Sequence, residues 1–177
     1  MSRSVLLLRA VNVSGRNSVP MARLREVLAE KTDLADVSTY IASGNIICRT
    51  PRQADAACAA VRAAILDEFG VDTPVIHRTH AQLVSSESAQ PFPEGDVKFV
   101  HAMFLEGTPS PGAVKALEQR LLPTERIALI GDDLWIDYGE GGVHSTKLTR
   151  AVLDRALGVA GTARNLRTTR TLIELTE

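Results

Sequence analysis

Near its start the chain reads SVLLLRAVNVSGRNSVP over residues 4–20, and later IASGNIICR over residues 41–49. The first stretch opens with an apolar run that predicts a buried strand over residues 4–11, followed by a polar loop. Pro20 suits the first turn of a helix, because the N–H that it lacks would have no partner there. The second stretch predicts a tight turn at 43–45, where Gly and Asn tolerate positive φ, and a returning strand over 45–49. Polar groups at two neighbouring strand ends predict a polar surface site on a mixed α/β domain.

The first half of the chain continues this pattern. An alternating segment over residues 36–42 predicts the second strand, and apolar residues at helical spacing over 54–69 predict a helix that Gly70 closes. A fourth strand is predicted over 73–77. The order is strand, helix, strand, strand, helix, strand, which is the ferredoxin-like or split βαβ unit.

The second half repeats the order without a residue-level repeat. A strand over residues 97–105, a helix after Pro109 and Pro111, a hairpin of 125–130 with 134–138, and a helix over 146–157 follow one another. A short extended piece at 162–163 then precedes a final helix over 165–175. We therefore predict an α+β fold of two ferredoxin-like halves packed as one compact unit. The halves are residues 1–78 and 97–177, with a connector over 79–96 and an extra C-terminal helix.

Composition narrows the functional classes. The chain has 177 residues, 45% of them hydrophobic, and a net charge of −1, which favours neither nucleic acid nor membrane. Residues 1–50 carry seven Lys/Arg and four Asp/Glu, a balance of +3, and residues 144–177 carry six and three, again +3. The segments between them are acidic. If the basic ends meet in space, they form a surface that attracts an anion; scattered solvated charge is the alternative.

Several partners and compartments are disfavoured by the same residues. Binding of RNA to a ferredoxin-like sheet needs aromatic residues on the two central strands, and the strands predicted there have none. No apolar run approaches the ~20 residues of a membrane span. The two cysteines have no ligand-like spacing and fit a reducing compartment, so a cytoplasmic protein is predicted. The four histidines match no metal motif, so neither a metal nor a cofactor is predicted.

Three motifs, in order, resemble the bacterial domain-of-unknown-function family 1697. They are LLLRAVNVSGRN at 6–17 with MARLR at 21–25, TYIASGN at 39–45, and the closing HSTKLT at 144–149 with GV at 158–159 and TARN at 162–165. The resemblance spans nearly the whole chain. The chain departs from the family pattern at Ala10 and Ser14, where the family usually has Gly, and at Leu166, where it usually has an aromatic residue. Because the family has no known function, the resemblance implies a fold and an extent but no chemistry.

The leading functional hypothesis is a composite site for a small phosphate- or carboxylate-bearing ligand. Arg9 ends a buried strand, where a charge needs an anion or a partner such as Asp36 or Glu26. The loop from Asn12 to Asn17 leads into a helix N-terminus and either binds an anion or satisfies its own backbone. The candidate ligand-binding residues are Arg9, Asn12, Asn17, Ser43, Asn45, Ser145, Lys147, Arg164 and Asn165.

Two alternatives remain open at this point. Ser145 caps the helix predicted after it, or it acts as a nucleophile with Lys147 or His144 as base, which would make the protein a hydrolase or transferase. Arg164, Arg167 and Arg170 recur every three residues around the last helix and form either a solvated face or part of the anion site. A non-catalytic interaction module that forms a homodimer through an exposed sheet edge is the other alternative. The residues establish neither an enzyme nor a reaction.

Overall fold

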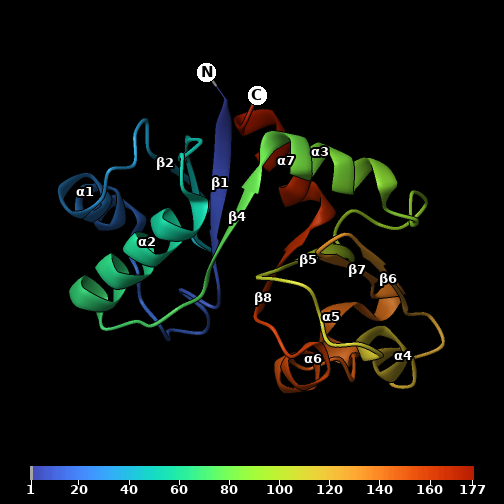
Figure 1. Cartoon of the computed structure of the whole chain (residues 1–177). Helices are drawn as coiled ribbons and strands as arrows, with labels where there is room; N and C mark the ends of the chain where they lie inside the picture. Colours follow the sequence, from blue (N-terminus) through green and yellow to red (C-terminus); the bar gives the residue numbers. More distant parts are fainter. Residues whose placement is uncertain (1) are drawn as a thin grey trace. The chain divides into compact units, whose positions relative to one another are not determined.

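The computed structural model describes residues 2–177, and its contacts divide the chain into two units (Figure 1). Unit 1 comprises the chain up to Leu83 together with Leu172–Glu177, and unit 2 comprises Val84–Thr171. Each unit holds one four-stranded antiparallel sheet packed with helices. The division falls within two helices, α3 (His80–Ala89) and α7 (Leu166–Leu175).

The sheet of unit 1 has the strand order β2-β3-β1-β4. Its strands are β1 (Arg3–Leu8), β2 (Ser38–Tyr40), β3 (Asn45–Arg49) and β4 (Val75–Thr79). In the register of β1 with β3, Arg3 is opposite Arg49 and Leu7 is opposite Asn45. The end of β1 therefore lies beside the start of β3, which brings the two polar loops of the sequence to one end of the sheet.

Two helices, α1 (Met21–Lys31) and α2 (Ala54–Phe69), cover one face of this sheet (Figure 1). Leu6 and Leu8 from β1 pack there in one core with Leu24 of α1 and Ile65 of α2. Strand residues alternate between faces, so each strand gives this core every second side chain. Burial of these leucines and isoleucines stabilises the layer by roughly 1.5–3 kcal/mol per side chain.

The sheet of unit 2 has the equivalent order β6-β7-β5-β8. Its strands are β5 (Val100–Leu105), β6 (Arg126–Ile130), β7 (Asp133–Asp137) and β8 (Gly161–Asn165). The helical segments between them are α4 (Ala113–Glu118), the 3-10 turn η1 (Gly139–Gly141), α5 (Gly142–Ser145) and α6 (Arg150–Leu157). Met103 and Leu105 pack with Leu117 of α4 and Leu157 of α6. On the other face, Trp135 donates a hydrogen bond from Nε1 to Ser86 Oγ on α3 at 3.0 Å.

The predicted α+β fold with two ferredoxin-like halves is confirmed. The first strand ends at Leu8 rather than at residue 11, because the backbone is left-handed at Ala10 (φ 52°). The helix predicted over 146–157 begins only at Arg150, because Thr149 is its N-cap and accepts the Val152 N–H at 3.3 Å. The predicted connector 79–96 contains α3, and the predicted extended piece at 162–163 is part of β8.

Candidate functional site

The five predicted site residues of unit 1 lie at one end of its sheet. Arg9 directly follows β1, and Asn45 begins β3 opposite Leu7. The Leu8 N–H donates to the Gly44 carbonyl at 2.8 Å, which fixes the β2–β3 turn against the end of β1. A side chain on Gly44 would meet Leu8, with its Cβ 2.7 Å from the Leu8 Cβ. The turn needs glycine here for close approach and for its φ of +84°.

Asn12 joins the loop after β1 to this turn. Its Nδ2 donates to the Ala42 carbonyl at 2.8 Å and to the Val19 carbonyl at 2.9 Å, and its Oδ1 accepts the Val19 N–H at 2.8 Å. Both hydrogens of the amide are therefore used by the backbone. The structure gives Asn12 a positioning role, which corresponds to the alternative that this loop satisfies its own backbone.

The other two asparagines also bind the backbone through Nδ2. Asn17 donates to the Ala10 carbonyl at 3.0 Å, and Asn45 donates to the Tyr40 carbonyl at 2.9 Å and to Ser43 Oγ at 3.2 Å. These bonds shape the two loops. Any ligand at this end would therefore be held mainly by groups other than the three Nδ2 atoms.

The loops adopt left-handed backbone at seven positions, five of which are not glycine. The residues with positive φ are Ala10, Asn12, Ser14, Gly15, Asn17, Ile41 and Gly44. Ala10 (φ 52°) and Ser14 (φ 51°) adopt a backbone conformation that favours glycine, although neither residue is glycine. Ile41 is a genuine outlier, because β-branched residues rarely adopt positive φ. Strained residues of this kind cluster at binding and switch sites.

Two arginines bring positive charge to these loops. Thr73 fixes the backbone of Arg9, since its Oγ1 accepts the Arg9 N–H at 3.1 Å and donates to the Arg9 carbonyl at 2.7 Å. Of the partners proposed for Arg9 from sequence, Asp36 pairs with Arg49 at 2.7 Å and Glu26 pairs with Arg23. Arg16 is exposed beside the turn that the Val13–Arg16 bridge closes. Arg16 was not among the candidate ligand residues, although its place in a loop without a carboxylate was visible in the sequence.

In unit 2 the serine–lysine candidate is not assembled. Ser145, Lys147 and His144 are exposed, and the described structure (residues 2–177) shows no hydrogen bond among their side chains. The prediction of Ser145 as a helix cap is wrong, because it ends α5 and Thr149 caps α6. The arrangement thus offers no support for a Ser145 nucleophile, which needs a base within hydrogen-bond reach.

Arg164 and Asn165 lie on β8 rather than on the last helix. Arg164 is only 7% exposed, and its Nη1 donates to Thr162 Oγ1 at 2.8 Å and to the Ala163 carbonyl at 2.9 Å. Burial lowers the pKa of this guanidinium to about 10. The Asn165 Oδ1 accepts the Thr168 N–H at 2.8 Å and so caps α7. The predicted stripe with Arg167 and Arg170 is therefore not a helical stripe, because its first member is a buried strand residue.

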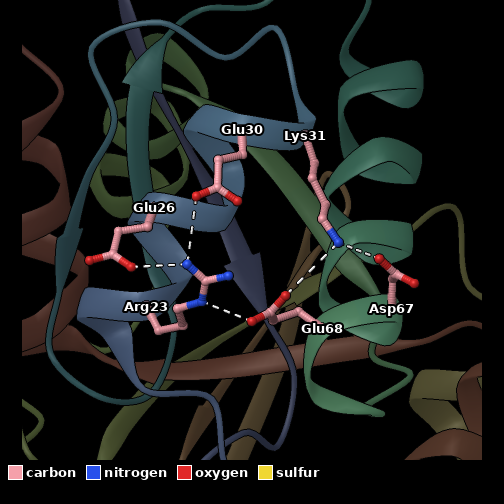
Figure 2. Close-up of polar contacts among 6 residues, drawn as sticks. All are labelled: Arg23, Glu26, Glu30, Lys31, Asp67 and Glu68. Carbon is pink, nitrogen blue, oxygen red and sulfur yellow. Dashed lines mark hydrogen bonds and ion pairs between the residues drawn. The ribbon is translucent and has the colours of Figure 1, made fainter.

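An ionic network links α1 and α2 on the outside of unit 1 (Figure 2). Its members are Arg23, Glu26, Glu30, Lys31, Asp67 and Glu68. Arg23 pairs through its Nε with Glu68 at 2.8 Å, and Lys31 pairs with Asp67. The bond from Arg23 is the main cause that lowers the pKa of Glu68, and the bond from Lys31 is the main cause that lowers that of Asp67. These cations are occupied and offer little to a ligand.

A cavity of about 590 Å³ opens at the other end of the unit 1 sheet. It lies between the end of α1 and the start of α2, and its cationic lining residues are Arg49 and Arg52. Arg49 already pairs with Asp36. Over residues 2–177, no group of three or more His, Cys, Asp or Glu residues could hold a metal ion. Within the same range, no helix has the length and apolar content needed to cross a membrane.

Comparisons with known proteins agree with the fold. The conserved bacterial protein SP0830 from Streptococcus pneumoniae has a similar structure, with a TM-score of 0.78 and 21% sequence identity over 99% of both chains. No curated protein matches the chain. A family described as a protein of unknown function, DUF1697, matches residues 1–135. The match covers most of the chain, which therefore belongs to the DUF1697 family.

Proposed function

We propose that the protein binds a small phosphate- or carboxylate-bearing ligand at the loops 9–20 and 41–44 of unit 1, here called the loop site. The observation that carries this proposal is the charge of these loops. They contain Arg9 and Arg16 and not one Asp or Glu, in a chain with 21 acidic residues. A surface of one sign attracts ligands of the opposite sign.

Backbone groups add to this attraction. Helix α1 follows the loop directly, its N-cap is Pro20 without a side-chain hydrogen bond, and its first turn has no acidic residue. The first N–H groups of such a helix have no partner within the helix and favour an anion. The Asn12 bonds to Val19 hold the loop against this helix start. Because the asparagines fix the loops, Arg16 and the backbone N–H groups become the main candidate contacts.

The proposal rests on unit 1 alone. Four other residues were expected from sequence to bind this ligand, and all of them lie in unit 2 and outside the loop site: Ser145, Lys147, Arg164 and Asn165. The burial of Arg164 and the capping bond of Asn165 favour structural roles for these two.

A thermal-shift screen of nucleotides, sugar phosphates and small carboxylates tests the loop site. A ligand that binds only the folded protein at 100 times its Kd stabilises it by about 2.7 kcal/mol. We expect at least one compound to raise the Tm, and Arg9→Ala and Arg16→Ala to reduce that shift. Arg52→Ala is the matched control, since it removes an exposed arginine that lines the 590 Å³ cavity at the other end of the unit 1 sheet. No shift with any compound, or a shift lost in Arg52→Ala but kept in Arg16→Ala, would refute the loop site.

A protein–protein contact at the same loops is the second candidate. Val13 is 49% exposed and Ile41 is 47% exposed, and they flank the hydrogen bond between Asn12 and Ala42. Sedimentation velocity over a range of concentrations would detect a homodimer. Ile41→Asn removes the apolar surface while tolerating the left-handed backbone. We expect this variant to lose self-association if the loops form the interface, and an unchanged monomer for both proteins would exclude a homodimer here.

A further inference from the structure

A groove in unit 2 runs between helices α4 and α6. Its lining includes small or apolar side chains from both helices. They are Ala116 and Leu117 of α4 and Ala151, Val152 and Ala156 of α6. The groove encloses a cavity of about 300 Å³, which is at the lower end of the size range of ligand sites. The short alanines leave space between the helices that longer side chains would fill.

A second cavity of about 380 Å³ extends this groove past the end of α4. The two cavities share Ala116 and Arg120 as lining residues. Gln119, Leu121 and Lys147 line the second cavity, which makes this end polar. The groove thus has an apolar part between the helices and a polar part where α4 ends.

Three cations line the groove: Arg120, Lys147 and Arg155. Within residues 2–177, none of them makes an ion pair or a side-chain hydrogen bond. Neither cavity has an Asp or Glu among its lining residues. Charges of one sign in a concave, partly apolar site focus their field and raise the local concentration of counter-ions.

We propose that the α4–α6 groove binds a small amphipathic anion. Arg120 and Lys147 hold its phosphate or carboxylate, and its apolar group lies over Ala116, Ala151 and Val152. Arg155 closes the apolar end with its aliphatic stem. Both parts of such a ligand contribute to its affinity. An inorganic anion gains no apolar contact with the lining of the groove, and a neutral molecule gains no ion pair with its cations. This groove is separate from the loop site, and neither proposal depends on the other.

The simpler explanation is that these cations serve the fold. Cations favour the C-terminal end of a helix, where carbonyl groups lack partners, and Arg120 and Lys147 lie beside the end of α4. If the cations serve only the fold, no ligand binds saturably, and the apolar part of a compound does not change its binding. A titration with matched compounds therefore distinguishes a structural role of the cations from a ligand site.

Isothermal titration of the full chain with phenyl phosphate, inorganic phosphate, benzoate and benzyl alcohol makes this test. We expect saturable binding of phenyl phosphate, affinity about tenfold lower for inorganic phosphate, and no binding of benzyl alcohol. Benzoate shows whether a carboxylate replaces the phosphate. No saturation by either aromatic anion up to about 10 mM would overturn the proposal, since that limit corresponds to under about 3 kcal/mol of binding free energy.

Variants locate the binding in the groove. We expect the double variant Arg120→Ala/Lys147→Ala to weaken phenyl phosphate at least about tenfold. The matched control is Lys115→Ala/Arg150→Ala, which removes two exposed cations from the same region that do not line the groove. We expect this control to bind within about twofold of the natural protein. Equal losses in both double variants would show non-specific attraction and refute the groove.

Two more variants separate the parts of the proposal. Ala151 is exposed and lines the groove, so Ala151→Leu fills part of the groove without changing its charge. We expect the affinity for phenyl phosphate to fall to that for inorganic phosphate. If the difference in affinity between phenyl phosphate and inorganic phosphate is unchanged in Ala151→Leu, the apolar part of the ligand does not lie over Ala151. Arg16→Ala removes charge from the loop site and should leave the phenyl phosphate affinity of the groove unchanged. Failure of the groove and failure of the loop site are therefore distinguishable.

Discussion

The two units share a strand order but differ in the connection that leads to their first helix and in whether the cations on their helices are paired. In unit 1 the connection from β1 to α1 spans residues 9–20, contains five left-handed residues and is fixed by asparagine amides. In unit 2 the connection from β5 to α4 spans only residues 106–112 and contains two prolines. The cations between α1 and α2 are paired, whereas those lining the α4–α6 groove have no ion pair within residues 2–177. One fold thus presents two chemically different surfaces, as expected when function resides in sites rather than in folds.

We expect the largest loss of stability from a single substitution in the connection from β1 to α1 of unit 1. Asn12→Ala removes three hydrogen bonds at about 1 kcal/mol each, so we expect a loss of about 3 kcal/mol in the free energy of unfolding. Urea denaturation measures it. Thr108→Ala in the shorter connection of unit 2 is the control, because Thr108 is exposed and its side chain makes no hydrogen bond within residues 2–177. A loss under about 1 kcal/mol in Asn12→Ala would contradict the positioning role.

Substitutions in the hairpin turns of the two units should cause the next largest change in the free energy of unfolding. Gly44→Ala places a Cβ 2.7 Å from the Leu8 Cβ, whereas a Cβ on Gly131, in the equivalent turn of unit 2, meets nothing within 4 Å. Both glycines have positive φ, so alanine is strained at either position. We expect losses of about 2 kcal/mol for Gly44→Ala and about 1 kcal/mol for Gly131→Ala. Equal losses in thermal or urea denaturation would show that the close approach of the unit 1 turn costs nothing.

Introducing glycine at position 14 of the unit 1 connection should change the free energy of unfolding less, and should increase it. Ser14 is exposed and has a φ of 51°, a conformation that costs a non-glycine residue about 1 kcal/mol. Ser14→Gly removes this strain but makes the unfolded chain more flexible. We expect a net gain below about 1 kcal/mol in urea denaturation. Destabilisation by Ser14→Gly would show that the strain of the left-handed backbone at this position is smaller than the cost of the added flexibility of the unfolded chain.

Substitutions in the ionic network of unit 1 should change stability least, because its groups are exposed or half-buried at the surface and are screened by salt. The pKa of Glu68 is lowered in the folded protein, mainly by the Arg23 bond, so its contribution is present above the unfolded pKa. That contribution is lost as the pH falls through the lowered folded pKa. Glu68→Gln should therefore be slightly less stable than the natural protein at pH 7 and equally stable at low pH. NMR titration of the Glu68 carboxyl measures the folded pKa directly, and an ordinary value would exclude the pairing.

Much of the fold was predictable from sequence, because hydrophobic periodicity marks each long element. The strand 45–49 and the helix 54–69 with its Gly70 cap match the structure in both type and bounds. The exact ends of β1 and α6 were not predictable, because a left-handed Ala10 and a cap at Thr149 leave no mark in apolar spacing. The strand β8 was underestimated, since its buried Arg164 reads as a polar surface residue.

Of the candidate site, the sequence predicted which segments lie close together but not which side chains are available to a ligand. The order of the strands indicates that Arg9, Asn12 and Asn45 meet, and the Leu8–Gly44 bond and the β1–β3 register bring their segments together. The sequence does not show which groups bind backbone and which face solvent, because an asparagine in a loop suits either role. The α4–α6 groove was not predicted, since its lining comes from three separated segments whose contacts depend on tertiary packing.

The contrast between paired and available cations is tested most directly by following the backbone amides of the ¹⁵N-labelled full chain by NMR during titration with phenyl phosphate. We expect saturable shifts in the segments around Ala116, Arg120 and Lys147, which line the groove, and no saturable shifts on the outer face of α1 and α2. Shifts centred on the ionic network of Arg23 and Glu68, or no saturable shift around the groove, would contradict this expectation.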